Sequence, residues 1–293
     1  MNIIEVNDLT KRYGELTAVD HISFTVEQGT MLGFLGINGA GKSTAINMLS
    51  TLLRPDEGSA VLCGHTLGKE DDAIRRKIGI VYQQNVLDEL LTVRENLLCR
   101  GILHGATRTQ AQTQLERLGT ILKLDEIMKK RYQTLSGGQK RRCEIAAALM
   151  HTPQILFLDE PTTGLDPATR KDVWQIIEML RRDENMTVFL TTHYMEEAAE
   201  ADRIIILDHG KIIDNGTPFQ LKERYARDKL RLYGKGELPG SPTVFGSEVV
   251  LDSTMDALPI LDSVKGRIRG FEVIQGTMDD VFLNAVGKSL EEG

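Results

Sequence analysis

The most informative run of this sequence is Gly36-Ile37-Asn38-Gly39-Ala40-Gly41-Lys42-Ser43-Thr44. It fits the pattern G-x-x-x-x-G-K-[ST], whose glycines let the backbone turn tightly and point its N–H groups at phosphate oxygens. The apolar residues 31–35 before it predict a buried strand, and residues 44–50 after it predict a helix. A helix N-terminus adds partial positive charge where the phosphates would lie. This context predicts a phosphate-binding loop in which Lys42 reaches the β- and γ-phosphates and Ser43 binds Mg²⁺.

A second run joins an apolar strand to two acids, Ile155-Leu156-Phe157-Leu158-Asp159-Glu160. A buried parallel strand delivers its last residue to the edge of the sheet where ligands bind in such folds. Asp159 is therefore predicted to hold Mg²⁺ through its water shell. Glu160, one residue further on, is predicted to orient or deprotonate the attacking water. Apolar strands also end in acids for purely structural reasons, so this prediction depends on its pairing with the glycine-rich loop.

A third run, Leu135-Ser136-Gly137-Gly138-Gln139, precedes a helical pattern from Lys140 to Met150. Ser136 suits the N-cap position, and the glycines leave backbone N–H groups exposed. The run predicts either a second anion site or a plainly capped helix with a flexible entry. One nucleotide rarely needs two phosphate cradles on one chain, unless each cradle belongs to a different composite site.

Patterning along the chain predicts alternating strands and helices around a mainly parallel sheet. Residues 1–30 alternate apolar and polar side chains, which predicts short antiparallel strands. Residues 93–149 change to helical spacing and predict a helical subdomain inserted in the α/β core. After about Arg227, a loop-like run at 234–242 precedes predicted strands at 248–251 and 270–274 and a last helix capped at Thr277-Met278-Asp279-Asp280.

The bulk properties exclude several classes of protein. The formal net charge of the 293-residue chain is −7, which argues against a general nucleic-acid binder. The basic runs at 129–131 and 140–142 are predicted to be solvated helix faces. Cys63, Cys99 and Cys143 lie far apart, which fits a reducing compartment. No secretory signal is evident, and no apolar run approaches the ~20 residues that span a bilayer, so we expect any membrane role to come through a partner.

Taken in this order, the three runs resemble the motifs of ATP-binding-cassette (ABC) ATPases, with Leu135–Gln139 similar to the family's signature sequence. The resemblance covers roughly residues 3–226. Tyr13 matches an aromatic residue that stacks on adenine. Gln83 matches a glutamine that senses Mg²⁺ and water. Its neighbour Gln84 is a rival, but Gln83 stands at the family's usual number of residues before Leu91-Thr92-Val93.

Two further positions complete the resemblance. Asp166, in the loop Gly164-Leu165-Asp166, matches the segment that crosses to the partner subunit, and His193 matches a histidine that contacts the γ-phosphate. The resemblance implies catalysis by Glu160, His193, Gln83 and Lys42, and metal binding by Ser43, Gln83 and Asp159. It implies that ATP is bound by Tyr13, Gly36, Asn38, Gly39, Ala40, Gly41, Lys42, Ser43, Thr44, Ser136, Gly137, Gly138, Gln139 and Asp166.

The family also implies an architecture and an assembly. The expected fold class is α/β, a P-loop NTPase core with N-terminal antiparallel strands, an inserted helical subdomain and a small C-terminal α+β appendage. The expected divisions are a nucleotide-binding domain at 1–227, with the helical subdomain at about 84–150, and an accessory region at 228–293. A head-to-tail dimer, with a second copy or a homologous ATPase subunit, would clamp ATP between the loop of Lys42 and the partner's run at 136–138. That arrangement accounts for the second cradle.

The tail narrows the choice within the family. Thr277-Met278-Asp279-Asp280-Val281-Phe282-Leu283 resembles the C-terminal segment of ATPases that serve ABC-2 exporters of the daunorubicin-resistance and sodium-export types. The leading hypothesis is therefore an exporter ATPase on the cytoplasmic face of the cell membrane, bound to a separately encoded polytopic permease and not to nucleic acid.

The segment after Gln83 is expected to form the groove that docks the permease. Its apolar residues are candidates for exposed contacts or for the core, and they are Val86, Leu87, Leu90 and Leu91. The alternatives are an importer ATPase, a soluble ABC ATPase of translation or DNA repair, and a catalytically inactive cassette. Intact Lys42, Asp159, Glu160 and His193 argue against the last of these.

Overall fold

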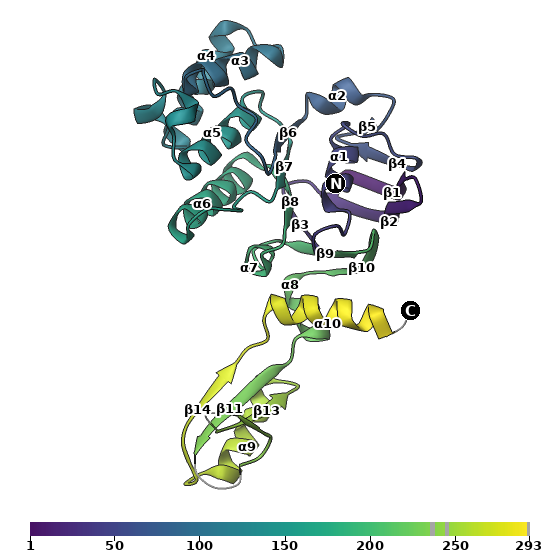
Figure 1. Ribbon diagram of the computed structural model, residues 1–293, viewed down its shortest axis with the longest axis vertical. Helices are drawn as coiled ribbons and strands as arrows, with labels where there is room; N and C mark the ends of the chain where they lie inside the picture. Colours follow the sequence, from purple (N-terminus) through teal and green to yellow (C-terminus); the bar gives the residue numbers. More distant parts are fainter. Residues whose placement is uncertain (235–237, 244–245, 292–293) are drawn as a thin grey trace.

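The computed structural model describes residues 1–234, 238–243 and 246–291 (Figure 1). Its first unit is an antiparallel sheet of order β2-β1-β4-β5. The strands are β1 (Asn2–Tyr13), β2 (Leu16–Glu27), β4 (Glu57–Leu62) and β5 (His65–Thr66). The strands predicted in residues 1–30 are antiparallel but not short, since β1 and β2 each run for 12 residues. Register shifts along the pair let both strands continue where the alternation of the sequence is irregular.

The second sheet has the order β10-β9-β3-β8-β7-β6, and only the pairing of β10 with β9 is antiparallel among the described residues. Its interior strands are buried on both faces, which explains their continuous apolar sequences. The strands are β3 (Met31–Leu35), β6 (Ile78–Val81), β7 (Ile155–Asp159), β8 (Thr187–Thr192), β9 (Arg203–Asp208) and β10 (Lys211–Gly216).

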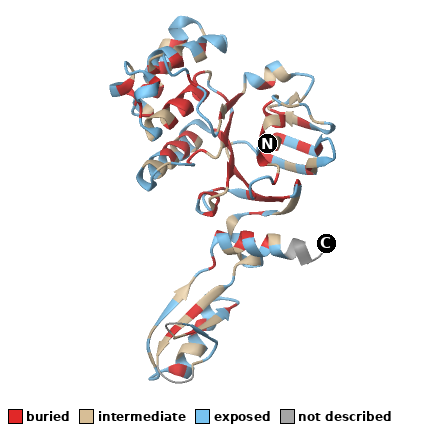
Figure 2. Ribbon diagram, in the orientation of Figure 1, coloured by how far each residue is buried: buried red, intermediate tan, exposed pale blue. Residues whose placement is uncertain are grey.

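The two faces of this second sheet support two different layers. One face packs with the antiparallel sheet and helix α1 (Lys42–Leu49) in one apolar core, which includes Phe34, Phe157 and Phe189. The other face packs with helices α5 (Gly137–Leu149), α6 (Pro167–Glu184) and α7 (Met195–Ala198). The sheet therefore forms the buried seam between the helices on one side and the antiparallel strands on the other (Figures 1 and 2).

A helical segment occupies the chain between the neighbouring strands β6 and β7, as the change to helical spacing predicted. Its helices begin at reciprocal capping boxes, with Thr92 capping α3, Thr107 capping α4 and Ser136 capping α5. The segment comprises α3 (Val93–Leu103), α4 (Arg108–Ile121), η1 (Asp125–Ile127), η2 (Tyr132–Thr134) and α5, while the short helix α2 (Asp71–Arg75) precedes β6.

The C-terminal part extends away from the core as a small sheet of order β12-β13-β11-β14 with one helix, α9 (Figure 1). The loop predicted at 234–242 differs in part, since β12 begins at Ser241, and residues 235–237 of that prediction lie outside the described residues. The elements are β11 (Asp228–Gly234), β12 (Ser241–Thr243), β13 (Gly246–Leu251), η3 (Thr254–Asp256), α9 (Ala257–Val264) and β14 (Ile268–Ile274).

The last helix, α10 (Met278–Glu291), returns to the main body, which the sequence patterning did not predict. It packs against α8 (Pro218–Tyr225), α7 and β10. Its residues Met278, Val281 and Phe282 are buried in the same core as α5 and α6. The predicted cap is present, because Asp280 accepts hydrogen bonds from the N–H and hydroxyl of Thr277. None of the helices in the described ranges combines the length and apolar character needed to cross a bilayer.

Candidate nucleotide-binding and hydrolysis site

The glycine-rich loop connects β3 to α1, as its flanking sequence predicted. Gly41 caps the helix in the left-handed region at φ +105°, where an added Cβ would lie 2.3 Å from the main-chain oxygen of Ala18. Only glycine fits this position without displacing β2. No described side chain caps the helix, so its first N–H groups remain available to an anion. The geometry is that of a phosphate cradle.

The Lys42 side chain curls back over this loop. Its Nζ donates to the main-chain oxygens of Gly36 at 2.6 Å and Ile37 at 3.1 Å, and the residue is buried. Burial lowers the pKa of this amine, while the carboxylates of Glu160 and Asp159 act in the opposite direction. The ammonium group is thus held at the phosphate loop by its main-chain oxygens.

Asp159 ends strand β7 next to the phosphate loop. Thr191, on the adjacent strand β8, donates its hydroxyl to Asp159 Oδ1 at 2.5 Å. The hydroxyl of Ser43 lies 3.5 Å from the same oxygen. Carboxylate and hydroxyl oxygens are hard donors that suit Mg²⁺, which takes few protein ligands and keeps several waters. These residue types therefore fit the predicted magnesium site.

Glu160 adopts an uncommon backbone conformation, with φ +47°. Its N–H donates to the main-chain oxygen of Thr191 at 3.0 Å, which holds the turn in place. Left-handed backbone at a non-glycine residue costs free energy and persists only where the surroundings fix it. From this turn the Glu160 carboxylate reaches the side chains of Gln83 and Thr163.

The Glu160 carboxylate is contacted by three side chains, two of which come from distant segments of the chain. Gln83 Nε2 donates to Glu160 Oε2 at 3.0 Å, and the Thr163 hydroxyl donates to the same oxygen at 3.2 Å. His193 Nδ1 lies 3.3 Å from that oxygen, a close approach without the alignment of a hydrogen bond. Three residues predicted separately as catalytic, Gln83, Glu160 and His193, therefore meet at one point. Gln84 makes no such contact among the described residues, which favours Gln83.

The signature run lies at the start of α5. Ser136 accepts the N–H of Gln139 at 3.4 Å, and the Gln139 side chain accepts the N–H of Ser136 at 3.1 Å. The side chain of Gln139 is thus engaged in capping its own helix. Gly138 is needed for packing, because an added Cβ would lie 2.3 Å from Thr169 Cγ2 on α6. The structure therefore shows this run as a capped helix N-terminus, and its role as a second anion site stays a prediction.

Asp166 and Tyr13 are two further residues that were predicted to bind ATP. Asp166 caps α6 by accepting the N–H groups of Ala168 and Thr169, each at 3.1 Å. The pKa of this carboxyl is lowered, chiefly by a hydrogen bond that it accepts from the Thr169 hydroxyl. Tyr13 ends β1 with half of its surface exposed, in the hairpin whose second strand touches the phosphate loop at Ala18. The Lys11 ammonium group lies 5.8 Å from the centre of its ring, and the exposed part of the ring can contact a planar group.

Arg141 corrects a prediction from the sequence. The run at 140–142 was expected to be a solvated helix face, but Arg141 is only 5% exposed. It donates to the main-chain oxygens of Pro161, of Tyr82 at 2.5 Å and of Asp159 at 3.4 Å. Burial lowers its pKa to about 10, so it stays charged at neutral pH. The neighbours of Arg141 along α5, Lys140 and Arg142, are also basic, so the sequence of the helix gave no signal that this residue points inward.

Thr191 is a second residue that sequence reasoning missed. It is fully buried in β8 and orients Asp159. The available signal was its place at the end of a strand whose carboxyl edge must meet that of β7.

Comparisons with known proteins agree with this geometry. A family model described as ABC transporter matches residues 19–163. The daunorubicin/doxorubicin resistance ATP-binding protein of Streptomyces peucetius is 38% identical, over 99% of this chain and 94% of that protein. This chain belongs to the ABC transporter ATPase family. The resemblance and the α/β fold predicted from sequence are confirmed, and the chain is an ATP-binding and ATP-hydrolysing enzyme of the family.

Other members extend the comparison. The Nod factor export ATP-binding protein I of Burkholderia lata is 35% identical, over 99% of this chain and 98% of that protein. A solved ATP-binding cassette, described as a dimer in a post-hydrolysis state with ADP and Pi, superposes with a TM-score of 0.65 and 30% identity. That superposition covers 73% of this chain and 98% of the solved cassette, so this chain has a further part beyond the cassette.

Proposed function

We propose that this ABC ATPase powers an exporter, with Glu160 as the residue that orients or deprotonates the attacking water. The contact of Gln83 and His193 with the Glu160 carboxylate carries this proposal. Lys42 and the N–H groups of the loop would bind the phosphates, and His193 would contact the γ-phosphate. Ser43, Asp159 and Gln83 would hold Mg²⁺, which when bound neutralises charge on the phosphate oxygens.

The composite site needs a second subunit. The Ser136–Gly138 cradle begins a different helix from the Lys42 loop, and the solved relative is a dimer. We therefore propose a head-to-tail dimer in which the partner's cradle covers the γ-phosphate and Asp166 lies at the crossing. Closure would exclude water and place two helix N-termini at the phosphates. Tyr13, exposed at its hairpin, would stack on the adenine.

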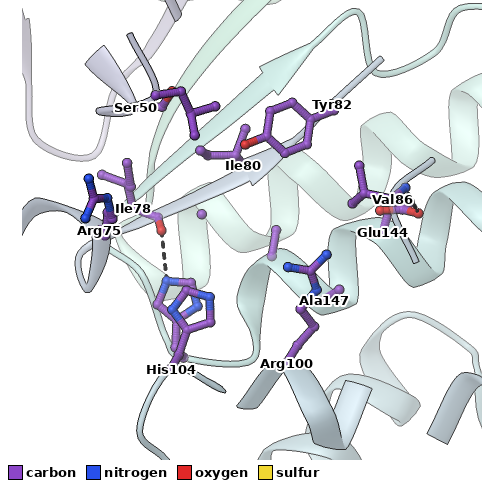
Figure 3. Close-up of a pocket in the computed structure, with 14 residues that line it drawn as sticks. Ser50, Arg75, Ile78, Ile80, Tyr82, Val86, Arg100, His104, Glu144 and Ala147 are labelled. Atoms are coloured by element: carbon purple, nitrogen blue, oxygen red, sulfur yellow. Dashed lines mark hydrogen bonds between the residues drawn. The ribbon is translucent and has the colours of Figure 1, made fainter. Parts of the chain in front are cut away.

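A groove next to Gln83 supports a membrane partner. It has a volume of about 210 Å³ and lies between β6 and the helical segment, lined by residues that include Tyr82, Val86 and Arg100 (Figure 3). Of the four predicted docking candidates, Val86 and Leu90 are 45% and 69% exposed, Leu91 is half-buried, and Leu87 belongs to the core. The mixed apolar and basic walls favour a polytopic permease as the occupant, with this chain peripheral on the cytoplasmic face.

The direction of transport rests on the relatives. Two of them are named for drug resistance and for Nod factor export, and both match over nearly the whole chain, including the C-terminal part. This favours an exporter over an importer or a soluble ABC ATPase. We propose the divisions 1–227 for the nucleotide-binding domain, about 84–150 for its helical subdomain and 228–293 for an accessory region, which α10 fastens to α8.

Glu160→Gln tests the proposal. The variant keeps the shape of the side chain and removes the base, so it should bind ATP and dimerise while kcat falls by at least about 100-fold. Light scattering with ATP would measure the dimer, and purification of the tagged variant from mildly solubilised native cells would identify its partner by mass spectrometry. Normal hydrolysis by Glu160→Gln would refute the role of Glu160, and ribosomal or repair proteins as partners would favour the soluble class.

A further inference from the structure

The segment that follows strand β6 is held by helix α5 at two points. Arg141 donates to the main-chain oxygen of Tyr82 at 2.5 Å. Glu144, one turn later on the same helix, accepts the main-chain N–H groups of Val86 at 2.9 Å and Leu87 at 3.1 Å. Figure 3 shows Glu144 directly beside Val86 at the wall of the groove. The catalytic glutamine lies between the two attachment points.

Glu144 is suited to a permanent structural contact. It is only 3% exposed, and its Oε1 also accepts the hydroxyl of Tyr132 at 2.7 Å. A carboxylate is costly to bury unless donors surround it, and three donors converge on this one oxygen. Burial, followed by the hydrogen bond to Glu144, raises the pKa of Tyr132, so the phenol remains a protonated donor at all ordinary pH values.

The consequence is a mechanical link between three places. Helix α5 begins at Ser136 in the signature cradle, carries Arg141 to the carboxyl end of β7, and carries Glu144 to the groove. The main chain from Tyr82 to Leu87 cannot move relative to α5 without breaking charge-assisted hydrogen bonds, which are about twice as strong as neutral ones. A partner that displaces Val86 must therefore move α5, or break these bonds.

We propose that Glu144 is a positioning residue that holds the segment so that Gln83 reaches Glu160, and that it joins the wall of the groove to the signature helix. The inference rests on the proposed function, which places Gln83 at the metal and the attacking water. Glu144 does not touch the nucleotide site itself, and it acts through the main chain of Val86 and Leu87.

Steady-state ATPase kinetics of the full-length chain test this role. Glu144→Ala removes the acceptor of all three donors, so kcat should fall about tenfold, the loss expected if about 1.4 kcal/mol of positioning is withdrawn from the transition state. KM for ATP should stay within about twofold, because Lys42 and Tyr13 are not attached to this segment. Glu144→Gln keeps an oxygen at the same reach, and kcat should recover to within about threefold of the wild type.

Two further variants keep the test decisive. Glu178→Ala removes an exposed carboxylate from α6 and should keep the wild-type kcat. Tyr132→Phe removes one donor and keeps the ring in the core, so kcat should fall about threefold even if Glu144→Ala fails to fold. Wild-type kcat in either Glu144→Ala or Tyr132→Phe would overturn the proposal, and so would a tenfold loss that Glu144→Gln does not restore.

The same assay separates this inference from the proposed function. If the wild type hydrolyses ATP, Glu160→Gln does not, and Glu144→Ala behaves as the wild type, only the positioning role is wrong. If the wild type fails to hydrolyse ATP, or Glu160→Gln hydrolyses it normally, the proposed function is wrong and the positioning role is overturned with it.

Discussion

The hydrogen bond between Thr191 and Asp159 offers a sharp test of how the metal site is built. Thr191→Val replaces a hydroxyl with a methyl group of similar size, so it removes the 2.5 Å hydrogen bond to Asp159 Oδ1 without opening a cavity. Because Thr191 is fully buried and the valine methyl group would fill the place of its hydroxyl, no water can enter that position to act as the donor. The Asp159 carboxylate then loses the contact that turns it toward Ser43.

The magnitude follows from the charge of the acceptor. A hydrogen bond to a charged group contributes about 1.5–3 kcal/mol, and we expect the free energy of unfolding to fall by about that amount. If half of it is also lost from metal binding, the Mg²⁺ concentration for half-maximal ATPase activity should rise about tenfold or somewhat less. Urea unfolding and a Mg²⁺ titration at saturating ATP would measure the two effects.

Thr192→Val is the matched control. Thr192 is the next residue of β8, and its hydroxyl donates to Glu197 at 2.7 Å on the other side of the strand. It should lower stability by a similar amount and leave the Mg²⁺ titration unchanged. An unchanged titration in Thr191→Val, or an equal shift in both variants, would refute the assignment of Thr191 as the residue that orients Asp159.

Two other predictions concern packing and pH. Gly138→Ala places a Cβ against Thr169, so the free energy of unfolding should fall by about 1–3 kcal/mol in a urea titration, and an unchanged midpoint would contradict this packing. Burial lowers the pKa of His151 from 6.5 to about 4, helped by the stacked ring of His104. As the pH falls, His151 is therefore protonated in the unfolded chain before it is protonated in the folded chain. The contribution of neutral His151 to the free energy of unfolding is complete above pH 6.5. It should be lost as the pH falls toward 4, by on the order of 3 kcal/mol. Unfolding measured at pH 7.5 and 4.5 should show a smaller loss in His151→Gln, and an equal loss in both proteins would contradict the assignment.

Most of the fold could be predicted from local pattern. The apolar runs at 31–35 and 155–158 became β3 and β7, and the predicted cap at Thr277 begins α10. These features are local, because burial on both faces fixes composition and a cap needs a polar residue within one turn of its N–H groups. The helix α9 and the return of α10 to the core were not predicted, since neither depends on a local signal.

Arg141 shows why some of the site could not be predicted. Its neighbours Lys140 and Arg142 are also basic, and the run by itself is typical of a solvated face. Burial of the middle arginine depends on three main-chain oxygens contributed by Tyr82, Asp159 and Pro161. No pattern within α5 encodes where those oxygens lie, because their positions depend on how β6, β7 and the helix pack together.

The sequence by itself determined which residue types stand at the phosphate loop, at the end of β7 and at the start of α5. Those identities are set by backbone freedom, helix capping and strand burial, which act over a few residues. Only the tertiary structure decided which groups meet. The side chain of Gln83 meets that of Glu160, the side chain of Thr191 meets that of Asp159, and the side chain of Glu144 meets the main chain of Val86. Each of these pairs joins segments far apart in the chain, and their distance is fixed by the packing of whole strands and helices.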